Sequence, residues 1–336
     1  MARNKKCITV NLKSERGCEI VHDLIGKSDV LLENFRPGMM EKFGLAPSRF
    51  HVSHPELVYT RVSGYGQTGP NSERPGFASA CEGYGGFRYI NGYPDQAPVR
   101  PNLSIGDTLA AMNAVIGTLI AIQGIAKSGK GQVVDVSIYE SVFGMLEGVV
   151  PEFDGAGVIR EPSGTTVTGI SPTNTYVCRD NKFVVIGGNG DSIFKRLCAA
   201  MDRNDLGNDE RLFDNAGRVE YQPELDSAIE TWTKTMTSVE VLAALDVAGV
   251  PNGPINSVAD MMKDEHFQAR GMFEEVNIDG KRTLKVPAMV PKLSDTPGET
   301  RTAGPTELGA SNKEIFEGLL GLSPDFIEEL QRDGVI

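Results

Sequence analysis

A glycine–aspartate pair, Gly106-Asp107, opens a long uncharged segment that runs to Lys127. An aspartate in the first turn of a helix usually acts as a cap, because its carboxylate accepts hydrogen bonds from the free backbone N–H groups there. The same position suits a reactive carboxylate, since the helix dipole favours the ionised form and the preceding glycine leaves one face open. These residues alone leave both roles open.

The segment Gly64–Gly69 reads GYGQTG and matches the G-x-G-x-x-G pattern of dinucleotide-binding loops. In those proteins the loop opens a helix that holds the pyrophosphate, and an acidic residue about twenty positions later holds a ribose. Here Pro70 and Asn71 continue the loop, and no acidic residue stands at a strand end at that distance. The pattern therefore disfavours a dehydrogenase and predicts a backbone that comes close to some other ligand.

Three further loops carry groups that bind anions or aromatic rings. Asn34–Gly38 (NFRPG) could stack on an adenine and pair with a phosphate, or form an ordinary polar loop. Gly187–Gly190 (GGNG) could hold an anion on its N–H groups, or form a strand-to-helix turn capped by Asp191 or Ser192. Lys127–Gly131 lacks the spacing of a phosphate-binding loop and fits a helix end followed by glycine.

Composition excludes several classes of function. The formal net charge of −12 over 336 residues argues against a nucleic-acid or anionic-membrane surface, which would need a basic stripe. The five cysteines are odd in number and scattered, which fits reduced thiols and gives no metal signature. The four histidines are dispersed as well. We therefore expect neither a metal site nor a nucleic-acid partner.

One segment needs a membrane test. Residues 108–126 carry no charge and are nearly long enough to span a bilayer. Asn113, Gln123 and Gly117 interrupt the apolar run, and a helix that is apolar all round is also typical of a protein core. We expect a buried core helix and no membrane span. No signal peptide is visible, so we expect a cytoplasmic protein, or a mitochondrial-matrix protein if a targeting segment precedes this N-terminus.

The first 150 residues alternate short strands with helices, which predicts an α/β fold with a parallel sheet covered by helices on both faces. Ligands in such folds bind at the carboxyl ends of strands, so the loops after Leu32 and Ser63 are the first places to look. Residues 64–101 hold few periodic elements, and an irregular segment of that length is usually functional. The predicted strands are 7–12, 30–33, 57–63 and 132–138, and the predicted helices are 14–25, 39–43 and 46–51.

Composition shifts after Pro151, and residues 152–168 are predicted to be a loop. A second α+β unit follows, with a hairpin around Asp279-Gly280. We predict a large domain at 1–160, a small α+β domain at 170–292, and a linker with C-terminal helices at 293–336. The predicted strands are 173–177, 183–187, 273–278 and 284–287, and the predicted helices are 192–201, 223–234, 238–248, 258–265, 312–320 and 325–333.

Together these loops and the long helix resemble the class III CoA-transferases, the group of formyl-CoA transferase and the carnitine CoA-transferases. The matching segments occur in family order and cover almost the whole chain. They are NKKCITVNLK (4–13), LENFRPG (32–38), SGYGQTGP (63–70), IGD (105–107) with its helix, SGKGQ (128–132), GVPNGP (249–254) and HFQARGM (266–272).

The resemblance implies a reaction at Asp107. The carboxylate would attack an acyl-CoA thioester to form a mixed anhydride, and the released CoA thiolate would then form an aspartyl-CoA thioester that the acceptor carboxylate consumes. Aspartate suits this role because its ordinary pKa of about 3.9 leaves it ionised at neutral pH without a helper base. CoA is then a substrate rather than a tightly bound cofactor. The family positions that contact CoA correspond to Asn11, Lys13, Asn34, Phe35, Arg36 and Lys42.

The resemblance also implies the architecture and the partners. Family members form an interlocked homodimer, each subunit with a Rossmann-like large domain and a smaller domain, and residues 312–333 would return to the large domain. Family members also begin with a further strand–helix unit, so this chain is expected to be N-terminally shortened.

Three functions remain open on these grounds. A CoA-transferase acting on short carboxylates is the leading hypothesis. The α-methylacyl-CoA racemases share the fold but carry a Gly-His-Asp stretch that here reads Gly76-Phe77-Ala78, with no histidine between His54 and His266. Racemisation needs that proton-exchanging partner. The third hypothesis is an inactive, truncated remnant.

Overall fold

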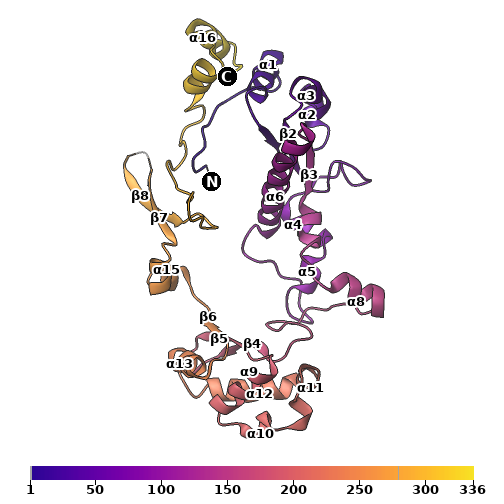
Figure 1. The fold of residues 1–336 in the computed structure, drawn as a ribbon, viewed down its shortest axis with the longest axis vertical. Coiled ribbons are helices and arrows are strands. Elements are labelled where there is room, and N and C mark those ends of the chain that lie inside the picture. The colour runs from indigo at the N-terminus through magenta and orange to yellow at the C-terminus, as the bar shows by residue number, and fades with distance from the viewer. Residues whose placement is uncertain (1, 279) are drawn as a thin grey trace. The chain divides into compact units, whose positions relative to one another are not determined.

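The structure, a computed structural model, describes residues 2–278 and 280–336. The chain divides into two compact units (Figure 1). Unit 1 comprises Met1–Gly85, Ser104–Met145 and Met262–Ile336, and unit 2 comprises Gly86–Leu103 and Leu146–Met261. Residues 262–292, which the sequence analysis assigned to the small domain, therefore group with unit 1, and the three-part domain assignment stays a prediction.

A parallel sheet forms the centre of unit 1, as predicted. Its strands are β1 (Val30–Glu33), β2 (Val58–Ser63) and β3 (Val133–Ser137), in the spatial order β1-β2-β3. Val30 lies opposite Val58, and Ser63 lies opposite Ser137. The register brings the carboxyl ends of β2 and β3 to the same edge of the sheet, where the predicted ligand loops begin.

Helices cover both faces of this sheet, also as predicted. On one face Tyr59 packs into a core built with α1 (Glu15–Ile25), α2 (Met39–Lys42) and α3 (Pro47–Ser53). On the other face Thr60 contacts Thr118 of α6, with 2.6 Å between the two hydroxyl oxygens. Side chains alternate between the two faces of a strand, so neighbouring residues of β2 belong to different cores.

The strand predicted at residues 7–12 is not a strand. The segment is extended, but it has no ladder with β1 and is bound instead by C-terminal residues. The backbone N–H of Thr9 donates to Asn312 Oδ1 at 2.9 Å, and that of Asn11 donates to the Val335 carbonyl at 2.8 Å. Alternating apolar residues favour an extended backbone, but they do not determine whether its partner is a strand or a loop.

The long helix α6 (Ile105–Ser128) was expected to be a buried core helix, and that expectation is wrong for the single chain. Small residues pack it closely on the sheet: a Cβ at Gly117 would lie 2.7 Å from Val134 Cγ1. Gly129, at φ 66°, ends the helix. Large apolar residues on the remaining surface are each more than half exposed, namely Met112, Val115, Ile116, Leu119 and Ile120.

By length and composition α6 is also the one helix in residues 2–278 and 280–336 that could cross a bilayer. Its most apolar window has a mean hydropathy of 1.8 and is only 17% buried. A helix that is hydrophobic all round requires a cover on every side. In unit 1 the sheet, α4 (Ala78–Tyr84) and α7 (Ile138–Phe143) pack against α6, while the side that carries its large apolar residues stays exposed.

The stretch 64–101 is more regular than its composition predicted. It contains α4 (Ala78–Tyr84), in unit 1, and α5 (Phe87–Ile90), in unit 2. α4 packs between α6 and α7 (Ile138–Phe143) through the buried Cys81. Both helices are too short for a 3.6-residue pattern to stand out from the surrounding glycine and proline.

Unit 2 has an antiparallel sheet of β4 (Thr173–Val177), β5 (Phe183–Gly187) and β6 (Asn252–Pro254). Its core joins this sheet to α9, α12 and α13. The two longer strands were predicted, β6 was missed because it has only three residues, and α8 replaces part of the loop predicted at 152–168. The helices are α8 (Val149–Ala156), α9 (Asp191–Ala200), α10 (Asn204–Gly207), η1 (Glu210–Leu212), α11 (Asn215–Glu220), α12 (Gln222–Thr233), α13 (Ser238–Ala248) and α14 (Val258–Met261).

The remaining part of unit 1 contains α15 (Glu265–Ala269), the hairpin β7 (Phe273–Ile278) and β8 (Arg282–Pro287), the π-helix η2 (Glu314–Leu319) and α16 (Pro324–Arg332). The hairpin was predicted, although the first residue of its turn, 279, lies outside the described residues. Phe316 and Leu330 pack against Ile20 of α1. The C-terminal segment therefore lies against α1 and the N-terminal segment.

Candidate functional site

Asp107 lies in the first turn of α6 with its carboxylate exposed and does not cap the helix. The N-terminal donor next to it is taken by another side chain: the N–H of Gly106 donates to Glu82 Oε1 at 3.2 Å. Among the residues that the structure describes, no hydrogen bond or ion pair joins the Asp107 side chain. The carboxylate is therefore exposed and unpaired at the positive end of the helix dipole.

Gly106 has a different role from the open face that the sequence suggested. It is buried, and a Cβ there would lie 3.1 Å from Ile138 Cγ2 and 3.2 Å from Glu82 Cγ. Contacts of 3.0–3.4 Å are tighter than most real Cβ contacts, so a larger residue would displace the helix terminus. Glycine here allows α6, α4 and α7 to meet closely enough to position Asp107.

A cavity of about 740 Å³ adjoins Asp107, and we call it the Asp107 cavity. Its walls come from the loops after β1 and β2, from α6 and from the N-terminal segment, as expected for a ligand site at strand ends. A Cβ at Gly64 would lie 3.0 Å from Gly76 Cα, so glycine lets two loops cross at the wall. The polar and charged residues in its lining are Lys5, Asn34, Ser63 and Asp107.

Cys81 lies beneath this site and is not suited to be its nucleophile. The side chain is fully buried and its thiol donates to the Gly64 carbonyl at 3.3 Å. Burial, followed by the negative charges of Asp107 and Glu82, raises the pKa of the thiol above its ordinary value. A thiol nucleophile needs the thiolate form, which these surroundings disfavour.

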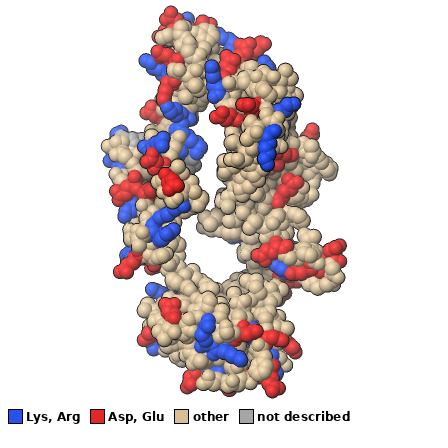
Figure 2. Space-filling model, in the orientation of Figure 1, with Lys and Arg blue, Asp and Glu red and all other residues tan. Residues whose placement is uncertain are grey.

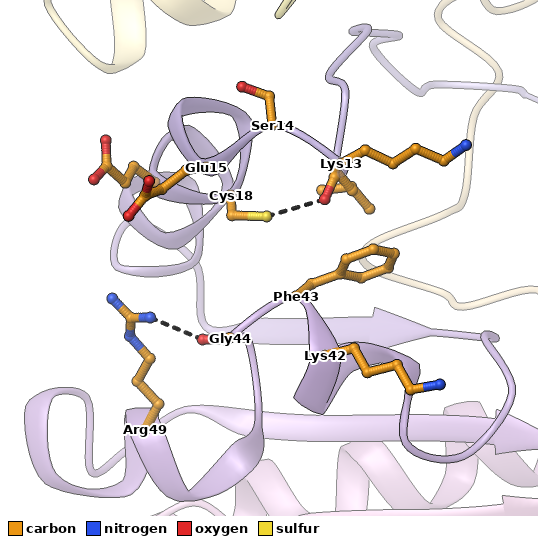
Figure 3. Close-up of a pocket in the computed structure, with 10 residues that line it drawn as sticks. Lys13, Ser14, Glu15, Cys18, Lys42, Phe43, Gly44 and Arg49 are labelled. Carbon is orange, nitrogen blue, oxygen red and sulfur yellow. Dashed lines mark hydrogen bonds between the residues drawn. The ribbon is translucent and has the colours of Figure 1, made fainter.

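A second cavity, of about 420 Å³, brings together two of the predicted CoA-contacting residues, Lys13 and Lys42. Figure 3 shows their amino groups extending to the same side, with the Phe43 ring between them. Arg49 adds a third cation, although its Nη1 donates to the Gly44 carbonyl at 2.9 Å. We call this the Lys13–Lys42 cavity. Glu15 and Glu19 also line the cavity, so its three cations outnumber its carboxylates by one. The two lysines beside the N-terminus of α1, unpaired among the described residues, suit a phosphate group.

The loop 34–36 connects the two cavities. Asn34 lines the Asp107 cavity, while the Phe35 ring contacts Phe43 of the other cavity at a centroid distance of 5.8 Å. Arg36 is exposed and lines neither of the two. Asn11 also lies outside both: its Oδ1 accepts from the Lys13 N–H at 3.0 Å, so it positions the backbone of Lys13.

Sequence reasoning missed a buried ion cluster below this loop. Arg61 of β2 donates through Nε to Glu33 Oε1 at 2.7 Å and through Nη1 to Glu41 Oε1 at 2.7 Å. The other Glu33 oxygen accepts from the Phe35 N–H at 2.7 Å. Arg61 thus ties the 34–36 loop to α2, which carries Lys42. A lone arginine in a strand that is otherwise uncharged was the signal that could have revealed it.

The hydrogen bonds of the cluster hold both kinds of group in their charged forms. Bonding to Arg61 lowers the pKa of Glu41 below its ordinary value. Burial opposes the charge on Arg61, but the bonds to Glu41 and Glu33 outweigh it and raise the pKa of the guanidinium. Arg61 and Glu33 are each only 5% exposed, so neither can exchange its partner for water.

The two glycine patterns have structural roles in the described residues. In 64–69 the Gln67 N–H donates to Asp135 Oδ2 at 3.0 Å, which holds the loop against β3. Gly187–Gly190 forms the turn into α9, but neither of the expected caps acts there. Asp191 instead pairs with the buried Arg218 at 2.7 Å, and Arg218 also donates to the Asn189 carbonyl.

The part of the chain that the structure describes offers few groups for metal binding or for histidine catalysis at this site. No group of three or more His, Cys, Asp or Glu side chains is arranged to hold a metal ion there. No histidine lines the Asp107 cavity. The racemase hypothesis, which needs a proton-exchanging partner beside the aspartate, therefore gains no support from this site.

Comparison with known proteins gives a family match along most of the chain. The sequence profile of CoA-transferase family III matches residues 1–312. Succinyl-CoA–D-citramalate CoA-transferase of Chloroflexus aurantiacus is 43% identical over 336 residues, a match that covers 100% of this chain and 83% of the relative. Succinate–glutarate CoA-transferase of Agrobacterium fabrum is 30% identical, covering 88% of this chain and 75% of the relative.

The fold is shared with a solved structure as well. A CAIB/BAIF family protein from Brucella suis superposes with a TM-score of 0.81 and 30% sequence identity. The match covers 95% of this chain and 82% of that one. The likeness therefore extends over both units of the chain.

Proposed function

The chain belongs to CoA-transferase family III and is an enzyme of that class, and from this we propose that it moves CoA from a short acyl-CoA to a short carboxylate acceptor, with Asp107 as the nucleophile. One observation carries the assignment to Asp107. Its carboxylate is uncapped at a helix N-terminus and faces a cavity at the carboxyl ends of the strands. A nucleophilic carboxylate requires this accessibility and needs no base to activate it.

The proposed reaction has two steps with the donor and two steps with the acceptor. A carboxylate oxygen of Asp107 attacks the thioester carbon of the donor, the C–S bond breaks, and a mixed anhydride and CoA thiolate result. The thiolate then attacks the carbonyl carbon of Asp107 and releases the donor as a free carboxylate. The acceptor carboxylate then attacks the aspartyl-CoA thioester, which gives a second mixed anhydride and CoA thiolate. The thiolate attacks the acyl carbon of the acceptor, which gives the new acyl-CoA and frees Asp107. No redox change and no net proton transfer occur.

The two cavities would hold different parts of the acyl-CoA. Lys13 and Lys42 would pair with phosphates, because two ammonium groups on one side of a cavity attract a multiply charged anion. Phe35, which is 40% exposed, would stack on the adenine, with Arg36 beside it. Asn34 would contact the thioester end next to Asp107. Asn11 would act through Lys13.

We further propose that the donor is succinyl-CoA or a similar dicarboxylyl thioester. Two of the relatives reported above are named for succinyl-CoA with D-citramalate and for succinate with glutarate. All of these are short dicarboxylates or their thioesters. The Asp107 cavity carries a cation as well as the nucleophile, which fits a substrate with a second negative charge.

A second copy of the chain would cover the exposed face of α6, in a homodimer as the family resemblance implies. Residues 112, 115, 116 and 119 follow a helical spacing and form a continuous apolar face. Figure 2 shows few charged side chains over α6 on the side in view.

Sedimentation velocity tests the dimer. Leu119→Asp should dissociate it, whereas Val247→Asp, at an exposed position of unit 2, should leave it intact. A monomeric wild type would refute the proposal.

A trapping experiment tests the function. The chain is incubated with succinyl-CoA and hydroxylamine, and the peptide containing residue 107 is weighed. We expect a hydroxamate on Asp107 that Asp107→Ala abolishes and that Asp154→Ala, which removes an exposed carboxylate in unit 2, leaves unchanged. A folded protein whose Asp107 stays unmodified with several acyl-CoA donors would contradict the proposal.

A further inference from the structure

Lys5 is the one cation that lines the Asp107 cavity within the described residues. It comes from the N-terminal segment, whereas Asp107 comes from α6, so the fold brings them together over about a hundred residues of sequence. The sequence analysis gave Lys5 no role, although it lies within a segment of family resemblance. Its place in the cavity wall is a finding of the structure.

The cations around Lys5 are neutralised, but Lys5 is not. Figure 2 shows Lys and Arg side chains gathered near the N-terminus with acidic side chains among them. Lys6 pairs with Glu314, and Arg301 Nε lies 2.6 Å from Glu299 Oε1. Over residues 2–278 and 280–336 no carboxylate lies within ion-pair distance of Lys5. Its ammonium is therefore available to a ligand.

The backbone at Lys5 is fixed by its neighbour. Asn4 Oδ1 accepts from the N–H groups of Arg301 and Thr302, at 2.8 and 3.2 Å, and Asn4 Nδ2 donates to the Glu299 carbonyl at 2.8 Å. Three bonds from one amide clamp this part of the segment to the C-terminal linker. The Lys5 side chain is exposed, and a clamped backbone limits the volume that its ammonium group can sample, which lowers the entropy lost when it binds an anion.

We propose that Lys5 binds the distal carboxylate of a dicarboxylyl group whose thioester carbon lies at Asp107, and thereby selects dicarboxylic substrates over neutral acyl groups of equal length. The inference rests on the proposed function. The remaining lining of the cavity is apolar or small, including Leu32, Val62 and Val115, so a carboxylate inside it has Lys5 as its cationic partner. A charge-assisted bond between an ammonium group and a carboxylate is stronger than a hydrogen bond between neutral groups.

A phosphate of CoA is the other anionic group of the substrate that Lys5 could bind. The phosphates have their own cations, Lys13 and Lys42, in the separate Lys13–Lys42 cavity. Lys5 shares a cavity with the nucleophile instead, and it also lines a neighbouring cavity with Lys6 and Arg301, whose charges are paired. A group that contacts the acyl part discriminates between acyl groups, whereas a group that contacts CoA lowers the rate with every thioester equally.

The test compares succinyl-CoA with butyryl-CoA, which has the same chain length but no distal charge. The first half-reaction is followed by the intact mass of the CoA-bound enzyme, so no acceptor is involved. For Lys5→Met we expect kcat/KM for succinyl-CoA to fall by about ten- to a hundredfold while that for butyryl-CoA changes little, because a charge-assisted bond is lost with one donor only. Lys5→Arg should restore most of the preference, and Lys6→Met should leave it unchanged.

Each outcome has a separate meaning. An equal loss with both donors would overturn the inference and assign Lys5 to CoA binding or to the reacting oxygen, while leaving the proposed function intact. Unchanged kinetics in Lys5→Met would overturn the inference as well. A wild-type enzyme that forms no CoA adduct with any donor would instead overturn the proposed function, and the inference with it. Thermal unfolding of Lys5→Met near the wild-type temperature would establish that no loss comes from misfolding.

Discussion

The Lys13–Lys42 cavity and the Asp107 cavity hold charge in different ways. The Lys13–Lys42 cavity gathers several charged side chains at the start of α1 and around α2, and Figure 3 shows its lysines extending outward. The Asp107 cavity has one cation and one anion in a lining that is otherwise apolar or uncharged. Dense charge suits a site that attracts a polyanion, and sparse charge in an apolar wall suits a site where one bond is to be made or broken.

This difference predicts that the two cavities have different roles. Changes in the Lys13–Lys42 cavity should alter binding, and changes at Asp107 should alter the chemical step. The 34–36 loop and the Arg61 cluster beneath it connect the two, so a change there should affect both. Four variants, one of them a double substitution, separate these cases by the size and kind of their effect.

The largest effect is expected at Asp107. Asp107→Asn removes the nucleophile but keeps the shape of the side chain, so kcat should fall by on the order of 10⁴-fold while the affinity for acyl-CoA stays near that of the wild type. Transfer assays give kcat, and calorimetric titration with a non-reactive CoA thioether gives the affinity. A loss of affinity as large as the loss of rate would show that the two cavities are not separate.

Arg61 comes next, because its removal leaves Glu33 buried without its charged partner. Arg61→Met should reduce the free energy of unfolding by about 3–5 kcal/mol, the usual cost of breaking a buried pair. Urea denaturation measures it. The exposed pair Arg203–Asp205 provides the control, since Arg203→Met should cost less than about 1 kcal/mol. Equal losses in the two variants would contradict a structural role for the cluster.

The lysine pair should affect binding alone. In Lys13→Met/Lys42→Met the KM for acyl-CoA should rise by about ten- to a hundredfold with kcat nearly unchanged, because ion pairs to phosphate are present in both the ground state and the transition state. Initial rates over a range of acyl-CoA concentrations measure both constants. Lys127→Met/Lys130→Met, at the far end of α6, is the matched control. A fall in kcat at unchanged KM would reverse the assignment of the two cavities.

How far the sequence predicts this structure depends on whether a feature is local. Val30–Glu33, Thr173–Val177 and Phe183–Gly187 were predicted with their correct bounds, because each is a short run with high strand propensity bounded by turn residues. The segment 7–12 carries the same signal and has no ladder, since its partners are C-terminal residues outside any strand, about three hundred positions away. Propensity specifies a conformation and not a partner.

The candidate site shows the same limit. The Gly-Asp pair and the NFRPG loop drew attention because their residue types are unusual and adjacent, but only the family resemblance gave them expected roles. Lys5 and Arg61 were not, because an isolated lysine or arginine is solvated by default, and only the fold shows what lies beside it. The apolar sequence of α6 predicted a buried helix, and that prediction is wrong for the single chain, because composition does not specify which sides of a helix are covered.

The smallest effect is expected for Glu41, which contributes to the change in the free energy of unfolding as the pH falls. Its pKa is lowered below the ordinary value of 4.5, chiefly by the hydrogen bonds from Arg61. The unfolded chain therefore binds a proton more readily than the folded one, so this contribution is complete above pH 4.5 and is lost as pH falls through the folded-state pKa. The carboxylate is 42% exposed, and solvent screening keeps the contribution modest.

Glu41→Gln should accordingly narrow the difference in unfolding free energy between neutral pH and a pH of about 4, measured by urea denaturation at each pH. Glu152→Gln removes a carboxylate of unit 2 whose pKa is likewise lowered, there by Arg160, and it should leave the unfolding of unit 1 unaffected. If Glu41→Gln lost stability in acid as steeply as the wild type, Glu41 would contribute no charge interaction to the Arg61 cluster, and only Arg61 and Glu33 would be paired beneath the 34–36 loop. The cluster would then be a buried pair rather than a bridge from β2 to α2, and the link between the two cavities would run only through the Phe35–Phe43 contact.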